Sequence, residues 1–373
     1  MQVVRARAAR RLVALLLVLS ALVPAAWSVP EPPAAAALAV AAPAAAPPAQ
    51  GPTRVRLSGQ RLAVESLVWL GEERGYFRQE GIDIEHVTFG SASEMIPALA
   101  TGQLDAAPMP ANPAMWNAVA RGVNARVVVD LGTYRPGESE QALMVRRAVY
   151  DAGRWHGLED LRSLSLAITP PGKATTTACA LSVGLQQAGL TLDDLNIQPI
   201  TFPDMVGALA NGSVDAAMMV EPFLSRAVQQ GTAVRAIGLG DLYPYFTIAT
   251  LGFADPLYSN RPAARGFVRA YLRALRDYLP AVAGQSGEAA RAEIVDVIAR
   301  GTGIDPATVA TMTPPYFNPN GLPNRSSMLY CYEFFRGQGL IPQPVPDSVL
   351  QGTLWGTDLV EDVLNELGRL PES

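Results

Sequence analysis

The chain has 373 residues, of which 49% are hydrophobic, and its formal net charge at pH 7 is −5. This length is sufficient for two domains with substantial cores. The acidic balance excludes a nucleic-acid binder, because no basic stripe is present to neutralise phosphate groups. The sequence also has no CxxC motif and no cluster of cysteine and histidine, so we expect neither a metal nor a cofactor.

The first 28 residues have the pattern of a signal peptide. Four arginines within residues 1–11 precede an apolar run over 12–23, and small residues follow. This order predicts export to the periplasm. The apolar run is shorter than a typical membrane span, although a retained membrane anchor is the alternative. No cysteine lies near the cleavage stretch, which disfavours a lipid-anchored protein.

Residues 29–52 consist almost entirely of alanine and proline. Such a composition cannot bury a core and predicts a loose, partly polyproline-like tether. We therefore expect the folded part of the chain to begin near residue 53.

Residues 54–143 are expected to form the first part of lobe 1. Hydrophobic periodicity predicts short strands that alternate with helices, which is typical of a mostly parallel sheet. Asn112 is expected to cap a helix that begins at Pro113, where the missing N–H of proline costs nothing. The strands are predicted at 54–58, 81–85, 104–109 and 126–131, and the helices at 62–74, between 94 and 102, and at 113–120.

The same alternation restarts in residues 144–247, which are expected to form lobe 2. Its predicted elements include strands at 164–168 and 233–237 and helices at 173–188 and 223–230. Residues 248–373 are expected to pack back onto lobe 1 and include helices at 261–281 and 288–300. Segments 141–145 and 245–253 would then cross between the lobes, and two crossings form a hinge.

One passage occurs twice in the chain, 110 residues apart. Residues 95–109 and 205–219 are identical at nine of fifteen positions, and the first copy has three extra residues within 90–93. A period this long, present only twice, indicates two equivalent lobes rather than a solenoid. Two similar α/β lobes form a cleft between them.

The loops that follow parallel strands are the expected ligand edge of each lobe. Free N–H groups and the helix dipole at such places favour anionic or strongly polar groups. Lys173 would supply a cation there, and Ser91 and Ser93 would face it from the other lobe. The candidate ligand-binding residues are Gln60, Ser91, Ala92, Ser93, Asn112, Tyr134, Lys173, Ala174, Thr175, Thr176 and Glu221.

Each of these candidates also has a structural interpretation. Serine and threonine at helix starts commonly serve as caps, and a long lysine often extends into solvent. Glu221 could position a ligand amine or hydroxyl, or it could cap the helix that begins at Phe223.

Two pairs of residues are expected to be structural. Asp105 and Asp215 occupy equivalent places in the repeat, directly before buried strands, where a carboxylate accepts backbone N–H groups at a turn. Cys179 and Cys331 lie in helical patterns assigned to different lobes. Because a disulfide between them would lock the lobes together, we expect two buried free thiols.

The sequence gives little support for an enzyme. Its two histidines, His86 and His156, have no partner pattern for catalysis, and no nucleophile elbow, P-loop or dinucleotide-binding fingerprint is present.

Several segments resemble periplasmic solute-binding proteins of the nitrate, sulfonate and taurine type, a superfamily that also contains binders of thiamine pyrimidine precursors and pyrimidine synthases. The resemblance covers about residues 54–340. It is carried by the segments 75–85, 98–105 and 208–216 and by the dipeptide Glu221-Pro222.

The resemblance implies a type II-like clamshell of two α/β lobes joined by two crossover segments. It implies a monomer that captures a small polar, anionic solute in the cleft and delivers it to the membrane permease of an ABC transporter. Two alternatives remain: a binder of a thiamine pyrimidine precursor, or a pyrimidine-synthase-like enzyme. The cysteine-rich iron motif of those synthases has no counterpart in this sequence. A third alternative is that the protein is the binding subunit of a sensor rather than of a transporter.

Overall fold

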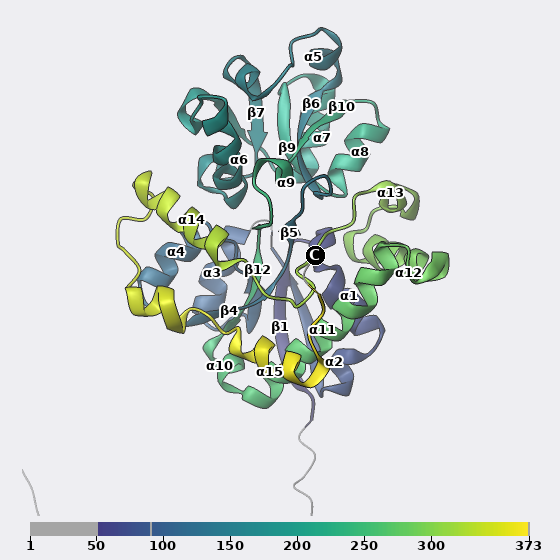
Figure 1. Cartoon of the computed structure of the whole chain (residues 1–373), viewed down its shortest axis with the longest axis vertical. Coiled ribbons are helices and arrows are strands. Elements are labelled where there is room, and N and C mark those ends of the chain that lie inside the picture. Colours follow the sequence, from purple (N-terminus) through teal and green to yellow (C-terminus); the bar gives the residue numbers. More distant parts are fainter. Residues whose placement is uncertain (1–50, 90–91, 372–373) are drawn as a thin grey trace, which may run out of the picture. The chain divides into compact units, whose positions relative to one another are not determined.

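The structure is a computed structural model that describes residues 51–89 and 92–371 (Figure 1). The predicted signal peptide, and all but the last two residues of the predicted tether, lie outside the described residues. The elements that follow belong to one compact unit, Gln50–Ser373. Within the described ranges, no helix combines the length and the apolar composition that crossing a membrane requires.

Two five-stranded sheets form the centres of two lobes (Figure 1). The first sheet has the order β2-β1-β3-β12-β4. Strand β1 pairs in parallel with β2 and β3, and β12 runs antiparallel between β3 and β4. Its strands are β1 (Thr53–Gly59), β2 (Ile82–Thr88), β3 (Ala106–Pro108), β4 (Ala125–Asp130) and β12 (Thr250–Ala254).

The second sheet has the order β10-β6-β9-β7-β8. Strand β7 pairs in parallel with β8 and β9, and β6 runs antiparallel between β9 and β10. Its strands are β6 (Gln141–Arg146), β7 (Ser165–Ile168), β8 (Asn196–Pro199), β9 (Ala216–Val220) and β10 (Ala233–Gly238).

The two sheets have the same topology. Strands β1, β2, β3 and β4 correspond to β7, β8, β9 and β10, and the crossing strands β12 and β6 occupy the same position. In each sheet the four corresponding strands share one direction, and only the crossing strand opposes them. The predicted α/β class, with two equivalent and mostly parallel lobes, is confirmed.

Helices cover both sheets, and the predicted helices at 113–120 and 261–281 match α4 and α11 closely. Around the first sheet lie η1 (Ala63–Glu65), α1 (Ser66–Glu73), α2 (Tyr76–Gln79), α3 (Ala92–Ala100), α4 (Pro113–Ala120), α10 (Asp255–Ser259), α11 (Arg261–Val282), α12 (Gly287–Thr302), α13 (Pro306–Thr311), α14 (Arg325–Gly337), η5 (Val349–Thr353) and α15 (Asp358–Leu367). Around the second lie α5 (Arg147–Asp151), η2 (Leu158–Ser163), η3 (Gly172–Ala174), α6 (Thr176–Gln187), η4 (Leu192–Asp194), α7 (Phe202–Asn211), α8 (Phe223–Gln229) and α9 (Leu239–Leu242).

The predicted helix at 173–188 begins later than expected, at Thr176. The Pro170–Pro171 peptide bond is cis, and residues 172–174 form the separate turn η3. The hydroxyl of Thr175 then caps α6 by accepting the N–H of Ala178 at 3.2 Å. The turn residues therefore precede the helix instead of forming its first turn.

A two-stranded antiparallel sheet joins the lobes. It pairs β5 (Thr133–Tyr134) with β11 (Phe246–Thr247), one strand from each crossing segment. The hydroxyls of Thr133 and Thr247 lie 3.1 Å apart, and Thr133 donates to the buried carboxylate of Asp130 at 3.0 Å. These contacts place a hydrogen-bonded hinge between the two sheets.

Asp105 and Asp215 are structural, as predicted. The Asp105 carboxylate accepts the backbone N–H of Arg56 at 2.8 Å and pairs with the guanidinium of the same residue at 2.8 Å. The Asp215 carboxylate accepts the backbone N–H of Ser165 at 3.2 Å and pairs with Arg146 at 2.8 Å. Each aspartate thus ties the beginning of one central strand to its neighbour.

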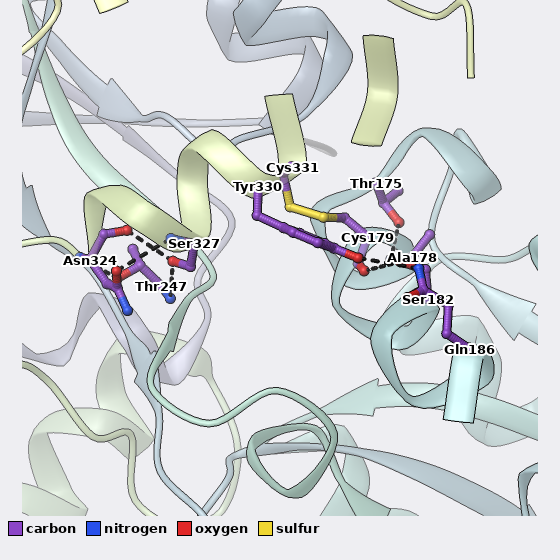
Figure 2. The surroundings of a disulfide bond; sticks show 10 residues. All are labelled: Thr175, Ala178, Cys179, Ser182, Gln186, Thr247, Asn324, Ser327, Tyr330 and Cys331. Atoms are coloured by element: carbon purple, nitrogen blue, oxygen red, sulfur yellow. Dashed lines mark hydrogen bonds between the residues drawn. A yellow bond between two sulfur atoms is a disulfide. The ribbon is translucent and has the colours of Figure 1, made fainter. Parts of the chain in front are cut away.

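The expectation of two free thiols is wrong, because Cys179 of α6 and Cys331 of α14 form a disulfide (Figure 2). The expectation assumed that helices from different lobes stay apart. In the structure, α14 packs against α6 of the second lobe as well as against α4 of the first, which brings the two Cα atoms to 5.8 Å.

Candidate functional site

A cavity of about 500 Å³ lies between the loops that follow strands of both sheets. The first sheet contributes Gln60 after β1, Phe89 after β2 and Asn112 after β3. The second contributes Thr169 after β7 and Thr201 after β8. These are carboxyl ends of parallel strands, where α/β sheets bind ligands. The volume is in the range of sites for small organic molecules.

Five predicted site residues line this cavity, and the structure brings them together from both lobes. They are Gln60, Asn112, Tyr134, Thr175 and Thr176. Of the candidates around α3, Ser91 lies outside the described residues, and the side chains of Ala92 and Ser93 are not described.

Three other predicted residues do not line the cavity. Lys173 is 42% exposed and forms an ion pair with Asp193 at 2.6 Å. Ala174 lies beside it in η3. Glu221 is buried, and its carboxylate accepts the N–H and the hydroxyl of Ser225 at 3.0 and 2.9 Å. Glu221 therefore caps α8, which was the structural alternative for this residue.

The start of α6 forms one polar wall of the cavity. The Thr175 hydroxyl has two backbone partners. It accepts the N–H of Ala178 as the helix cap and donates to the carbonyl oxygen of Gly172 at 2.9 Å. The hydroxyl of Thr176 is buried and has no hydrogen-bond partner within the described ranges. A positive helix end together with an unsatisfied hydroxyl can receive an acceptor group of a solute.

A buried chain of hydrogen bonds connects the hinge to this wall. The hydroxyl of Tyr134 donates to Oε1 of Gln141 at 2.6 Å, and Nε2 of Gln141 donates to the hydroxyl of Thr177 at 3.1 Å. Burial raises the pKa of Tyr134 well above its usual value. The phenol is therefore a neutral donor at physiological pH.

The carboxylic acids that line the cavity are Glu65, Glu94 and Glu140. No lysine, arginine or histidine of residues 51–89 and 92–371 lines it. The Glu65 carboxylate is held by the backbone N–H of Gln60 at 2.7 Å. Burial raises the pKa of Glu65, and hydrogen bonds from the backbone N–H groups of residues 60–62 oppose the rise.

Glu140 was not predicted as a site residue, and its environment is unusual. Its side chain is fully buried, and both carboxylate oxygens lack a hydrogen-bond partner among the described residues. Burial raises the pKa of Glu140 to about 8. The residue's own backbone N–H and the charge of Arg235 oppose the rise, and the nearby charges of Asp130 and Glu221 add to it. The sequence shows only a glutamate before an apolar strand, which gives no signal of this isolation.

The remaining walls of the cavity are apolar. Three phenylalanine rings, those of Phe89, Phe202 and Phe223, line it together with prolines such as Pro108 and Pro170. This combination of apolar walls and a few polar groups is typical of sites for small organic ligands.

Solved structures of periplasmic binding proteins share this fold. The alkanesulfonate-binding protein SsuA from Xanthomonas axonopodis pv. citri, bound to MOPS, is 22% identical, covers 79% of this chain and 96% of its own, and has a TM-score of 0.60. The aliphatic sulphonate binding protein SsuA from Escherichia coli is 20% identical, with coverages of 79% and 91% and a TM-score of 0.61.

The periplasmic nitrate-binding protein NrtA from Synechocystis PCC 6803 has a TM-score of 0.68. It is 15% identical and covers 85% of this chain and 89% of its own. At these identities the likeness concerns the fold. It confirms the two-lobed periplasmic-binding-protein architecture.

No curated protein gave a significant match to the chain. A protein-family model, by contrast, matches residues 49–299, which include both sheets and the hinge. The chain therefore belongs to the NMT1-like family.

Proposed function

We propose that this protein is the exported solute-binding component of an ABC-type importer. It captures a small polar solute in the cavity between its lobes and delivers the solute to a membrane permease. The observation that carries this proposal is the cavity of about 500 Å³, lined by the carboxyl ends of strands from both sheets. The sulfonate-binding and nitrate-binding proteins of the same fold support it.

Binding would be coupled to closure of the lobes. A solute that contacts Gln60 and Asn112 of one lobe and Thr176 of the other interacts fully only when the lobes approach each other. Only such a difference in affinity can shift the population toward a closed state. The closed form would then be the form that a permease recognises.

The solute class expected from the sequence is a sulfonate, nitrate or taurine-like anion. An acceptor group of the solute would bind at the start of α6, where the Thr176 hydroxyl is unsatisfied. The role of cationic ligand that the sequence suggested for Lys173 is not part of this proposal, because that lysine pairs with Asp193.

A thiamine pyrimidine precursor is a second candidate solute. Three phenylalanine rings line the cavity and can stack on a planar heterocycle. The glutamates of the lining can accept hydrogen bonds from its amino groups. In either case we propose binding without catalysis.

We propose a periplasmic location for the mature chain. Disulfides persist in oxidising compartments such as the periplasm, and the Cys179–Cys331 bond fits such a compartment. The basic and apolar pattern of residues 1–28 adds the sequence-based argument for export.

The test is a thermal-shift screen of the purified protein with sulfonates, taurine, nitrate, carboxylates and pyrimidine precursors, followed by calorimetry of each hit. A solute that binds only the native state raises the melting temperature by mass action. Ala249→Phe, which adds an aromatic ring to the cavity lining, should abolish the shift, and Ala152→Phe on the exposed surface should retain it. Hits that bind the Ala249→Phe variant equally well would contradict the proposal.

Transport is tested in cells. Uptake of the identified solute should fall when the gene is deleted and return with the wild-type chain but not with Ala249→Phe. Unchanged uptake after deletion would reject the importer role and leave solute binding in place.

A further inference from the structure

A buried carboxylate without a partner marks one place in the cavity. Glu140 lines the cavity, its side chain has 0% relative exposure, and neither carboxylate oxygen has a hydrogen-bond partner within the described residues. Burying an unpaired ionisable group is costly, so native proteins rarely retain one without a reason. Among residues 51–89 and 92–371, only the backbone N–H of Glu140 itself acts on this carboxylate as a donor, and no side chain does.

Arg235 is the basic residue whose charge acts on Glu140, but it does not donate a hydrogen bond to the carboxylate. The positive charge of Arg235 acts on Glu140, but its guanidinium donates to the carbonyl oxygen of Ser139 and to the hydroxyl of Thr313. The other charges that act on Glu140, those of Asp130 and Glu221, are acidic. The surroundings of Glu140 therefore favour an additional positive charge rather than an additional negative one.

We infer that Glu140 receives a protonated nitrogen group of an organic solute, such as an ammonium or an amidinium. The inference rests on the proposed solute-binding function and deepens it. Binding of the cation releases to solvent the proton that Glu140 holds in the ligand-free protein. The N–H groups of the cation then donate to the two carboxylate oxygens, which gives charge-assisted hydrogen bonds in a site shielded from water. The carbon skeleton of the solute contacts the phenylalanine rings of the lining.

This subsite distinguishes between classes of solute. A simple anion such as nitrate carries no donor for Glu140 and no apolar body for the aromatic walls. A molecule that has an acceptor group at one end and a protonated nitrogen at the other can use the Thr176 hydroxyl and Glu140 together. The protein thus selects an organic solute by its nitrogen group.

The test compares probes that differ only in that group. Taurine is paired with isethionate, and benzamidine with benzamide, and each binding constant is measured by calorimetry on the purified protein. In at least one pair, the member with the protonated nitrogen should bind about ten- to a hundredfold more tightly than the member without it, as expected for a hydrogen-bonded charge. Glu140→Gln should remove most of that preference.

Two further variants support the comparison. Glu138→Gln removes a carboxylate two residues away that is exposed and paired with Arg135, and it should retain the full preference. Glu140→Met replaces the side chain with an apolar one of similar length. It gives a second test of the same loss if Glu140→Gln fails to fold, as judged by circular dichroism.

The proposal is overturned if neither pair shows a preference for the protonated nitrogen, whether both members bind equally or neither binds. It is also overturned if Glu140→Gln and Glu140→Met retain the preference, since the protonated nitrogen would then be recognised by a group other than the Glu140 carboxylate. Tight binding of nitrate or a sulfonate that is unaffected by these variants rejects the nitrogen subsite and leaves the solute-binding function intact. Failure of every solute class rejects both.

Discussion

The Nζ atom of Lys173 lies 2.6 Å from Oδ1 of Asp193, in an ion pair on the surface of the second lobe. Asp193 belongs to η4, which follows α6 in the chain, and Lys173 does not line the cavity. The sequence predicted that the charge of Lys173 lies beside a ligand-binding loop. In the structure, this charge is paired with Asp193 of the same lobe. Without Lys173, the cavity has no cation in its described lining.

Lys173→Ala should leave solute affinity unchanged within about twofold. An exposed ion pair contributes roughly 0–1 kcal/mol to the free energy of unfolding, so only a small change in melting temperature is expected. Calorimetry with any solute found by screening checks the first expectation, and thermal melts check the second. A tenfold loss of affinity would show that the lysine reaches the solute.

Thr176→Val should weaken binding of solutes that carry an acceptor group by about two- to tenfold. The valine keeps the shape of the side chain and removes a hydroxyl that has no partner among the described residues. The ligand-free protein should be at least as stable as the wild type, because an unsatisfied buried group is lost. The readouts are calorimetry for affinity and thermal melts for stability.

Thr175→Val is the matched control for this substitution. It removes the cap of α6 and should lower the free energy of unfolding by about 1 kcal/mol. Its effect on affinity should be smaller than that of Thr176→Val, since the Thr175 hydroxyl is already occupied by backbone groups. The reverse order of affinities would mean that the cap is the solute ligand.

Local patterns and the internal repeat were sufficient to predict the lobes and many of their elements. Asn112 and Pro113 mark the start of α4, and the structure confirms that the Asn112 side chain accepts the N–H of Met115 at 3.0 Å. An aspartate three residues after a glycine occurs in both copies of the repeat, as Asp105 and Asp215, and this pattern likewise predicted two structural carboxylates. These features depend on residues close together in the sequence, or on a repeat that is visible in it.

The features that were missed depend on contacts between distant segments. Whether Cys331 meets Cys179 is decided by the path of α14 between the lobes. Whether Glu140 has a partner is decided by the direction in which Arg235 points. Neither the path of α14 nor the direction of the Arg235 side chain can be predicted from a single sequence.

Glu140→Gln should stabilise the ligand-free protein near pH 8 and reduce its pH dependence. Because burial raises the pKa of Glu140 to about 8, the folded protein holds a proton that the unfolded chain, with a pKa of about 4.3, releases. The free energy of unfolding therefore falls as the pH rises from about 4.3 to about 8. The substitution should raise it by about 1–2 kcal/mol at pH 8.

Denaturant titrations at pH 5, 6.5 and 8 measure this effect, and Glu138→Gln serves as the control. The stability difference between Glu140→Gln and wild type should grow with pH. A difference that is constant, or that shrinks with pH, would show that Glu140 is ionised in the folded protein at all three values.

Asp215→Asn should destabilise the protein at neutral pH. Burial alone would raise the pKa of Asp215, but hydrogen bonds from Arg146 and Ser165 outweigh it and hold the pKa below its usual value. The stabilisation is therefore present above the unfolded pKa of about 3.9 and is lost as the pH falls through the lower folded value.

Losing these hydrogen bonds should lower the free energy of unfolding by about 1–3 kcal/mol at pH 7. Denaturant titrations at pH 7 and pH 3 measure the difference, which should be smaller at pH 3. Asp204→Asn, at an exposed position in the first turn of α7, is a control of the same chemical change. Equal losses in the two variants would contradict the structural role of Asp215.

Replacing both cysteines by serine should lower the free energy of unfolding by about 2–5 kcal/mol. The bond closes a loop with a sequence separation of 152, and a cross-link over a long loop removes much of the entropy of the unfolded chain. Denaturant titrations without reductant compare the two proteins. Added reductant should bring the wild type toward the variant, and no difference between them would show that the thiols are unpaired in solution.

The same bond gives the chain the connectivity of a ring with two tails. The ring contains every residue from Cys179 to Cys331, including β12 and the helices α11 and α12. A single proteolytic cut within it opens the ring but leaves one covalent molecule, since the disulfide still joins the two pieces. Such a nicked protein runs at full mass on a denaturing gel and separates into two fragments only after reduction.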